Sequence, residues 1–541
     1  MAFRIRLNIP GNSHGEQGGA TVMAVVQLVR SLIGQLLAPA AALMVAYWVG
    51  RSIYNVNLHP LSKYPGPRLA AISDLWWAYA CTSGRYPWLI EDTLRKYGDV
   101  VRIAPNELVF INPQAAQDIY LAQEKSLETF VQVGYDALDT GDGGISGEAN
   151  PVRHREVAKK LAPAFSARNY KAKEGTIHKH LDFFVEKVKE LGAIGQPIEL
   201  RRWSDWLALD MSADLTYGRD MGQVRDMKDS LFMASALKLN LFVTMSQVVR
   251  KFRSGLFTLL PYLTIPPTVW PAMPFLIKMN SEIVQDRIGR RGELDHLDYF
   301  EQLIPSDTGT PVPDDKKHIF HLENVAGNLL LASWQPLADQ FYSLIFFLLR
   351  DQDSKAYEAL VEEVRSGFAE YESIDTEALS TAKFRFLQAC VSESLRLHQA
   401  TTDGLPRISP GAVVDGQYIP KGVTCQISYF AAVRNDRFFT EPREFRPERW
   451  LSNDPKHPQF DSRFKDDNLK VSRPFSQGLR GCPGGVIAQN VIRLFIAKVL
   501  WQFDLEAAPG IKDLSFDKDF RFLTFWERPQ FWLRFKPVPR R

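Results

Sequence analysis

The sequence predicts a mainly α-helical protein with small β-sheets, preceded by one N-terminal transmembrane helix. Two segments, 323–350 and 486–497, carry apolar residues at the spacing of a helix face. Two short apolar segments, 99–103 and 107–111, flank a connection that contains a proline, which predicts a β-hairpin. A run without charged residues, 31–50, is long enough to span a bilayer.

Composition limits what the protein does. The chain has 541 residues, of which 45% are hydrophobic and 12% aromatic, enough for a large core and an apolar pocket. Its formal net charge of +3 is close to neutral, so no nucleic-acid partner is expected. The four cysteines, Cys81, Cys390, Cys425 and Cys482, are too few and too scattered for a disulfide framework, which favours a reducing compartment.

The N-terminus predicts a membrane anchor. Tyr47 and Trp48 would lie at the membrane interface, and Arg51 follows them directly. A cleaved signal peptide is the alternative, but the apolar run is long and starts late. We therefore divide the chain into a tail over 1–30, a transmembrane anchor over 31–50, a proline-rich hinge over 51–68 and a folded domain over 69–541.

One short loop carries the strongest chemical signal. It places Cys482 in a turn with Gly478 and Gly484, because glycine permits positive φ and a close approach of the backbone. Arg480 lies two residues before the cysteine, and its guanidinium can grip a carboxylate. These residues fit an axial thiolate for a haem iron and a partner for a haem propionate. A buried structural cysteine is the alternative, because that is the usual role of a free cysteine.

The spacing of Phe475, Gly478, Arg480, Cys482 and Gly484 resembles the haem-binding loop of the cytochrome P450 family. The resemblance covers most of the chain and implies one large catalytic domain with the cytochrome P450 fold. It also implies haem b as the cofactor, with the iron bound by the cysteine. The phenylalanine would pack beside the thiolate, and the helix that follows the loop would run beneath the haem.

Two further motifs resemble the same family. Glu393 and Arg396 lie three residues apart in an apolar helical segment, and 447–450 reads Pro-Glu-Arg-Trp. Carried over by resemblance, Glu393, Arg396 and Arg449 form a charge triad that locks the region around the haem loop.

The resemblance implies further cofactor contacts and partners. Arg407 and His154 would hold the propionates together with Arg480, although the arginine usual four residues after the histidine is Ala158 here. Electrons would come from NADPH through a cytochrome P450 reductase, with cytochrome b5 as an optional second partner. Basic residues would face that reductase, namely Arg473, Lys159 and Lys160. The expected location is the endoplasmic reticulum membrane, single-pass, with the catalytic domain in the cytosol.

The predicted helix over 323–350 departs from the family pattern. The family places Ala/Gly-Gly-x-Asp/Glu-Thr-Thr above the iron, and alignment on Ala332 puts Gln335 at the acid and Pro336 at the catalytic threonine. Since proline has no N–H, we expect a kink that leaves the Ala332 carbonyl free for water. Ser333 and the Gln335 amide would orient that water.

Three interpretations of this departure stay open. A monooxygenase with altered proton delivery would hydroxylate, epoxidise or desaturate a hydrophobic small molecule. An enzyme that rearranges or dehydrates its substrate without activating O2, or a haem-binding protein without catalysis, would also lack the usual residues. We favour the monooxygenase because the loop, triad, anchor and hinge are all present. The motifs are most similar to those of fungal members that modify terpenoid, polyketide or alkaloid skeletons.

The predicted substrate pocket draws on several segments. Residues 332–337, 401–405 and 525–526 are expected to shape it. The apolar segment 231–273 is broken by prolines and predicts short helices that touch the membrane and roof the entrance. His178 and His180 are expected on a solvated helix face rather than at a metal, because residues two apart on a helix point to different sides.

Overall fold

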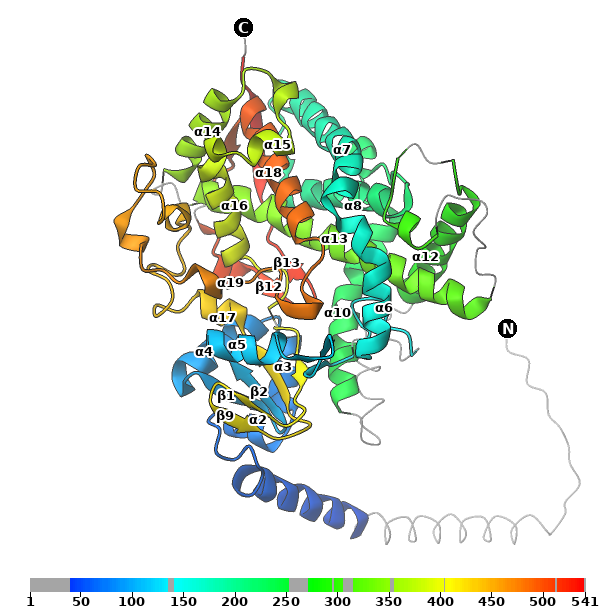
Figure 1. Ribbon diagram of the computed structural model, residues 1–541, viewed down its shortest axis with the longest axis vertical. Coiled ribbons are helices and arrows are strands. Elements are labelled where there is room, and N and C mark those ends of the chain that lie inside the picture. The colour runs from blue at the N-terminus through cyan, green and yellow to red at the C-terminus, as the bar shows by residue number, and fades with distance from the viewer. Residues whose placement is uncertain are drawn as a thin grey trace, which may run out of the picture.

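The computed structural model describes residues 39–134, 141–252, 271–293, 296–304, 315–350, 355–402, 404–510 and 513–539. Helices form most of this part of the chain, and small sheets lie at more than one place among them (Figure 1). The prediction of a mainly α-helical fold with small sheets is confirmed. The predicted tail and the predicted anchor up to residue 38 lie outside the described residues.

The helices and strands have the following bounds. The α-helices are α2 (Arg68–Ile72), α3 (Leu75–Thr82), α4 (Tyr86–Tyr97), α5 (Pro113–Tyr120), α6 (Pro151–Leu161), α7 (Ala167–Ala193), α8 (Leu200–Tyr217), α9 (Gln223–Asp226), α10 (Leu231–Lys251), α12 (Ala272–Gly289), α13 (Lys316–Arg350), α14 (Ala356–Gly367), α15 (Thr376–Leu379), α16 (Arg385–Leu397), α17 (Tyr429–Val433), α18 (Gly485–Gln502) and α19 (Phe516–Asp519). The strands are β1 (Val100–Ala104), β2 (Glu107–Phe110), β3 (Gln123–Glu124), β4 (Leu127–Glu128), β5 (Val131–Gln132), β6 (Ile198–Glu199), β7 (Arg407–Ile408), β8 (Ala412–Val414), β9 (Gln417–Ile419), β10 (Thr424–Ile427), β11 (Phe503–Ala507), β12 (Arg521–Phe522), β13 (Trp526–Glu527) and β14 (Trp532–Pro537).

The sheet with the most strands has the order β1-β2-β10-β7-β5. Its first two strands pair antiparallel, with Val101 opposite Val109, which confirms the predicted hairpin. β10 then pairs parallel with β2 and antiparallel with β7. Leu108 and Ile427 from this sheet are buried in one apolar cluster, so the sheet is fixed to the helices beneath it. Through β7 it positions Arg407, one of the predicted cofactor contacts.

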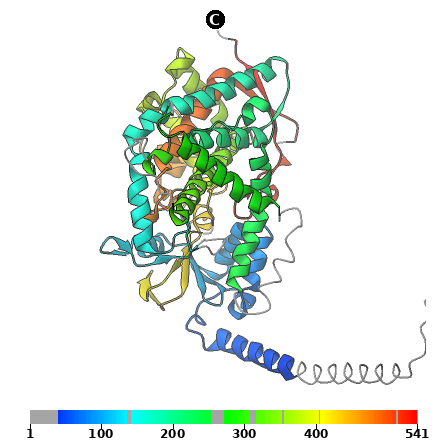
Figure 2. The same ribbon diagram turned by 90° about the vertical axis from the view of Figure 1, so that its right-hand side faces the viewer.

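Helix α13 is the central element of the helical part, and Figures 1 and 2 show it running through the middle of the molecule. It packs against α8, α16 and α18. Phe341 of α13 stacks on Phe495 of α18 with ring centroids 4.3 Å apart, an arrangement that contributes beyond simple area burial. This contact ties the helix that carries Ala332 to the helix that follows Cys482.

Helix α10 corrects the prediction of short helices after residue 231. It is one helix of 21 residues, because the first proline of the segment, Pro261, comes only after its end. Within the described part of the chain it is the one helix long and apolar enough to cross a membrane, yet half of its most apolar window is buried in the protein. The rest of the predicted segment, 253–270, lies outside the described residues.

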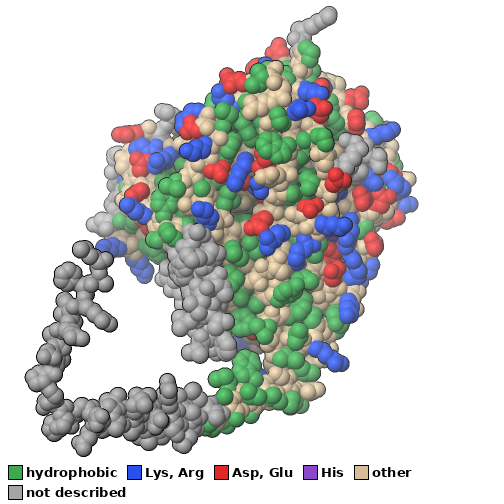
Figure 3. Space-filling model, turned by 180° about the vertical axis from the view of Figure 1, so that it is seen from behind, with side chains coloured by type: hydrophobic (Ala, Val, Ile, Leu, Met, Phe, Trp, Pro, Cys, Tyr) green, Lys and Arg blue, Asp and Glu red, His purple; other side chains and the backbone are tan. Residues whose placement is uncertain are grey.

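Residues 39–57 form a helix whose apolar side chains are exposed. Leu43 is 72% exposed and Val45 62%. Figure 3 shows hydrophobic side chains gathered on this helix at the lower end of the molecule. The second half of the predicted anchor is therefore helical and apolar.

One buried cluster joins α7, α8 and the segment 296–304. The Asp214 carboxylate contacts Nε2 of His180 and Nε2 of His296, both at 2.8 Å, and accepts a hydrogen bond from Lys179 at 3.0 Å. His180 is buried, so the expectation that it lies on a solvated face is wrong. The sequence pattern alone did not reveal this partner, which comes from another helix.

This cluster gives a pH-dependent stability. The hydrogen bond to Asp214 raises the pKa of His296 above its ordinary 6.5. The stabilisation is therefore complete below pH 6.5 and is lost as the pH rises through the folded-state pKa. We expect His296→Asn to lower the free energy of unfolding by about 1 kcal/mol more at pH 6 than at pH 8.5, measured in urea. His318→Asn, at an exposed site, is the control; equal losses at both pH values would contradict the assignment.

Candidate haem site

The Cys482 loop closes on itself before α18 begins. A short 3-10 turn over Gly478–Arg480 precedes the cysteine, and the Cys482 N–H donates to the Phe475 carbonyl oxygen at 2.9 Å. The Gly481 N–H donates to the Gly478 carbonyl oxygen at 3.0 Å. These bonds fix the cysteine directly in front of the N-terminus of a long, largely buried helix.

The glycines of the loop differ in their backbone conformation and in the space around them. Gly478 has φ +77, and a Cβ at this position would collide with the Tyr120 carbonyl oxygen, so glycine is required. The expected positive φ is wrong for Gly484, which has φ −83 and room for a Cβ. Space is limited at the next residue, Gly485, where an added Cβ would lie 3.0 Å from the Phe475 ring. Phe475 therefore packs on the start of α18.

Cys482 is an exposed residue, although protein surrounds most of its thiol group. The residue is exposed and unpaired, whereas Cys390 and Cys425 are buried. Burial by the surrounding protein still raises the pKa of the Cys482 thiol, and hydrogen bonds from the backbone of Gly484 and Gly485 act in the opposite direction. The alternative of a buried structural cysteine therefore fits Cys390 and Cys425 but not Cys482.

The three predicted propionate partners lie together. Arg407 and His154 are buried, and Arg480 interacts electrostatically with both. Burial, together with the positive charge of Arg480, lowers the pKa of His154 to about 4, so the imidazole is neutral at pH 7. The site therefore offers two guanidinium groups and a neutral ring N–H to an anionic ligand.

A carboxylate that the sequence did not point to belongs to this cluster. Glu128 of β4 accepts a hydrogen bond from Nε of Arg480 at 2.7 Å, and Nη2 of the same arginine lies 2.5 Å away. Nη1 of Arg480 also donates to the Glu148 carbonyl oxygen at 2.5 Å. Arg407 donates to the Leu405 carbonyl oxygen at 2.8 Å. Backbone and carboxylate oxygens thus hold both guanidinium groups in place.

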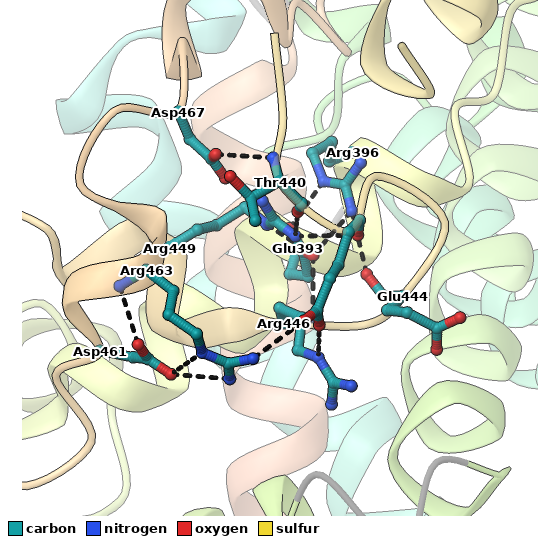
Figure 4. A network of polar contacts seen from close by, with 10 residues as sticks. Glu393, Arg396, Thr440, Glu444, Arg446, Arg449, Asp461, Arg463 and Asp467 are labelled. Atoms are coloured by element: carbon teal, nitrogen blue, oxygen red, sulfur yellow. Dashed lines mark hydrogen bonds and ion pairs between the residues drawn. The ribbon is translucent and has the colours of Figure 1, made fainter. Parts of the chain in front are cut away.

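The predicted charge triad is assembled, and Figure 4 shows it from close by. Arg396 contacts Glu393 through Nε and Nη2, each at 2.8 Å, and Nε of Arg449 reaches the same carboxylate at 3.0 Å. All three side chains are fully buried. Burial alone would raise the pKa of Glu393, but the two arginines hold it at about 2.

The triad also fixes the chain that leads toward the cysteine loop. Arg396 donates to the carbonyl oxygens of Val433 and Pro442, both at 2.7 Å, and to that of Glu444 at 3.1 Å. Arg449 donates to the Thr440 carbonyl oxygen at 3.0 Å. The buried guanidinium groups therefore satisfy carbonyl groups at the end of α17 and in the chain that follows it.

Helix α13 presents one accessible stripe in an otherwise buried stretch. Ala332 is exposed, and Ser333 and Pro336 are half-buried, whereas Trp334 and Gln335 are buried. Residues four apart share a helix face, so Ala332 and Pro336 line the same side. The Ser333 hydroxyl donates to the Leu329 carbonyl oxygen at 2.8 Å, within its own helix. α13 continues through Pro336, which removes one helical hydrogen bond without ending the helix.

A buried ion cluster one turn further along α13 is not visible in the sequence. Arg528 lies 3.1 Å from Asp339 of α13 and 2.5 Å from Asp205 of α8, and it donates to the Ala338 carbonyl oxygen at 2.8 Å. Burial raises the pKa of Asp339 to about 7, against the effect of Arg528. This cluster clamps α13 just beyond Pro336. Charged residues inside apolar helical segments are the one sequence signal that points to it.

Comparison with known proteins identifies the family. The model of the Cytochrome P450 family matches residues 77–531. Cytochrome P450 monooxygenase TwmD of Talaromyces wortmannii is 43% identical over 506 residues, which cover 93% of this chain and 97% of that protein. Cytochrome P450 monooxygenase poxC of Penicillium oxalicum is 33% identical over 513 residues, 94% of this chain and 96% of that protein. The chain belongs to the cytochrome P450 family.

Family and site agree on the chemistry. The chain is a haem-thiolate enzyme with monooxygenase activity, as the cysteine loop and motifs predicted. Cytochrome P450 monooxygenase btcC of Colletotrichum orbiculare is a further similar protein, 32% identical over 499 residues, 92% of this chain and 93% of that protein. The interpretation as a haem-binding protein without catalysis is not supported by these relatives.

Proposed function

We propose that this cytochrome P450 hydroxylates, epoxidises or desaturates a hydrophobic small molecule of fungal secondary metabolism. The observation that carries the proposal is the accessible stripe of Ala332 and Pro336, which lies directly before the buried stretch 337–349 of α13. Both side chains are apolar, so they favour an apolar group of a substrate over a charged one. The similar proteins named above come from fungi, which supports the biological setting.

The residues of the site fit a haem. Cys482 offers an accessible thiol as axial ligand, and the cluster of Arg480, Arg407 and His154 would hold the propionates. Phe475 packs on the start of α18, and we propose that its ring lies beside the thiolate when haem is bound. When bound, the haem supplies the redox chemistry and the activation of oxygen, and thiolate ligation favours O–O cleavage. The chain's own residues supply binding, orientation and the path of protons.

Proton supply in this chain rests on a different set of groups from the family's acid and threonine. The Ala332 carbonyl lacks its helical donor because Pro336 has no N–H, and an unpaired carbonyl attracts water. The Ser333 oxygen keeps acceptor capacity while its proton is bonded to Leu329. We propose that these two oxygens and the Gln335 amide hold the water that delivers protons.

Replacing the proline tests this proposal. Pro336→Ala restores the N–H and closes the water site, so we expect a more stable protein that turns over more slowly and releases more peroxide per NADPH consumed. An interior proline costs a helix about 3 kcal/mol, so the gain in stability should be large. Pro274→Ala in the first turn of α12 is the matched control. If Pro336→Ala keeps wild-type rate and coupling, protons arrive by another route.

Substrate rearrangement or dehydration without O2 is the second candidate. Gln335 and Pro336 favour it, because an enzyme that delivers no protons to dioxygen needs neither the acid nor the threonine. The two candidates differ in their need for electrons. Monooxygenation requires substrate-dependent NADPH consumption with a reductase, whereas rearrangement proceeds without NADPH.

We propose an NADPH-dependent cytochrome P450 reductase as the electron donor, with cytochrome b5 as an optional second partner. Lys159 and Lys160 at the end of α6 and Arg473 before the cysteine loop are all exposed. Exposed cations near the haem side attract an acidic partner surface and raise its association rate. Reversing these charges together should slow reduction at low salt and leave the spectrum unchanged.

We propose that the protein is anchored in the endoplasmic reticulum membrane by one helix over 31–50, with its catalytic domain in the cytosol. The exposed apolar helix over 39–57 supports this, since such a surface is unfavourable in water. Deleting residues 1–50 should release most of the protein from membranes. Protease added outside sealed microsomes should digest the catalytic domain, and full protection would place that domain in the lumen.

A further inference from the structure

The hairpin of β12 and β13 is fixed at its base and reaches α10 with its turn. At the base, the Trp526 indole N–H donates to the Gln399 carbonyl oxygen at 2.7 Å, and the Phe522 N–H donates to the Gly84 carbonyl oxygen at 2.9 Å. Thr524 and Phe525 in the turn are half-buried. The contacts at the base do not reach the turn, so other contacts must hold it in position.

One side chain of α10 binds the backbone of this turn. Asn240, which is 8% exposed, donates from Nδ2 to the Phe525 carbonyl oxygen at 3.2 Å. Its Oδ1 accepts from the N–H groups of Thr524 at 3.1 Å and Phe525 at 2.9 Å. Thr244, one helical turn later, places its hydroxyl 3.0 Å from that of Thr524. The amide thus uses both its donor and its acceptor on a single turn.

Helix α10 also reaches α13 next to the accessible stripe. Phe232 lies with its ring centroid 6.4 Å from that of Trp334, the residue between Ser333 and Gln335. Asn240 follows Phe232 by about two helical turns on the same helix. α10 therefore connects the middle of α13 to the tip of the β12–β13 hairpin, and these are two of the segments expected to shape the substrate pocket.

We infer that Asn240 is a positioning residue that sets which substrates enter and how tightly they are held. It fixes Thr524 and Phe525 against α10, so the turn and the helix stay in contact as long as these hydrogen bonds last. A bulky ligand passes only when the three hydrogen bonds to Asn240 break, whereas a small one passes without opening. This inference rests on the proposed haem-containing substrate pocket, but the hydrogen bonds themselves do not.

The chemistry of asparagine explains why another residue does not replace it. Alanine leaves the N–H groups of Thr524 and Phe525 without their partner, which is costly in a half-buried place, and the Phe525 carbonyl oxygen keeps only the Leu523 N–H at 3.2 Å. Aspartate keeps the oxygen that accepts from both N–H groups but loses the donor, and it turns a negative charge toward the Phe525 carbonyl. The expected order of turn stability is therefore asparagine, then aspartate, then alanine.

Hydrogen exchange of the holoenzyme tests the contact directly. We expect amide exchange in the peptide that spans 521–527 to become about tenfold faster in Asn240→Ala, which corresponds to about 1.4 kcal/mol. Asn240→Asp should give an intermediate value, and peptides of α13 and α18 should be unchanged. Asn55→Ala is the matched control, because Asn55 is a buried asparagine bonded to the Ile72 carbonyl oxygen far from the hairpin.

Binding of two azoles to the haem tests the consequence for ligand entry. In stopped-flow spectra, clotrimazole should associate and dissociate at least about fivefold faster with Asn240→Ala, whereas imidazole should change by less than about twofold. If the substitution only destabilised the protein, the rates of both azoles would change alike.

Unchanged exchange at 521–527, or equal acceleration of both azoles, would overturn the inference. A protein that takes up no haem would refute the proposed function instead, and the exchange experiment would still decide whether Asn240 holds the turn.

Discussion

Replacing Cys482 by serine should abolish the absorption band near about 450 nm that the reduced protein shows with carbon monoxide, because thiolate donation to iron causes that band. Monooxygenase turnover should fall to background in the same preparation. The physical reason is that a serine hydroxyl is not ionised at neutral pH and donates far less electron density. The spectrum of membranes that contain the variant is the measurement.

Cys81→Ser is the control for this experiment. Cys81 is only partly buried, so its replacement leaves the protein folded and the band in place. If Cys482→Ser kept the band, or if Cys390 or Cys425 proved necessary for it, the assignment of the axial ligand would be wrong. Both of those cysteines are buried, and burial raises the pKa of each thiol.

Glu393→Gln should lose most of the folded holoprotein. The change leaves Arg396 and Arg449 as buried cations without their shared carboxylate, and breaking a buried ion pair from one side costs about 3–5 kcal/mol. Since a domain is stable by only about 5–15 kcal/mol, the loss consumes a large part of the total. Haem content per protein and the urea midpoint are the measurements.

Glu444→Gln is the matched control for the triad. Glu444 is exposed and lies in the same region (Figure 4), where only its backbone carbonyl accepts from Arg396 at 3.1 Å. Removing its charge therefore leaves every contact of Arg396 intact. Equal stability of the Glu393 and Glu444 variants would mean that the triad does not stabilise the domain.

The sequence predicted those features that local patterns encode. The hairpin of β1 and β2 follows from two apolar segments around a turn, and α18 follows from helical spacing after the cysteine. The cysteine loop could be predicted because its residue types and spacing are set by one cofactor. The positive φ of Gly478 follows from the same loop, whereas Gly484 shows that spacing alone does not tell which glycine the backbone needs.

Contacts between distant segments could not be predicted in this way. Glu128 meets Arg480, and Asn240 meets the turn at Phe525, only because the fold brings together residues that are hundreds of positions apart. Asp214, the buried partner of His180, lies only 34 positions away but on another helix, so the helical pattern around His180 did not reveal it. The length of α10 was misjudged because the prolines that would break it follow its end. Local propensity describes single elements, whereas these contacts depend on how the elements pack.

The stoichiometry of turnover tests the assignment as a monooxygenase most directly. The substrate for this measurement is the compound that accumulates when the gene is deleted from its host. Membranes that contain the protein and a cytochrome P450 reductase should form product only with both NADPH and O2, and should consume the two in equal amounts. That result holds for hydroxylation, epoxidation and desaturation alike. Product formed at the same rate without NADPH, or without O2, would contradict the account and establish rearrangement or dehydration instead.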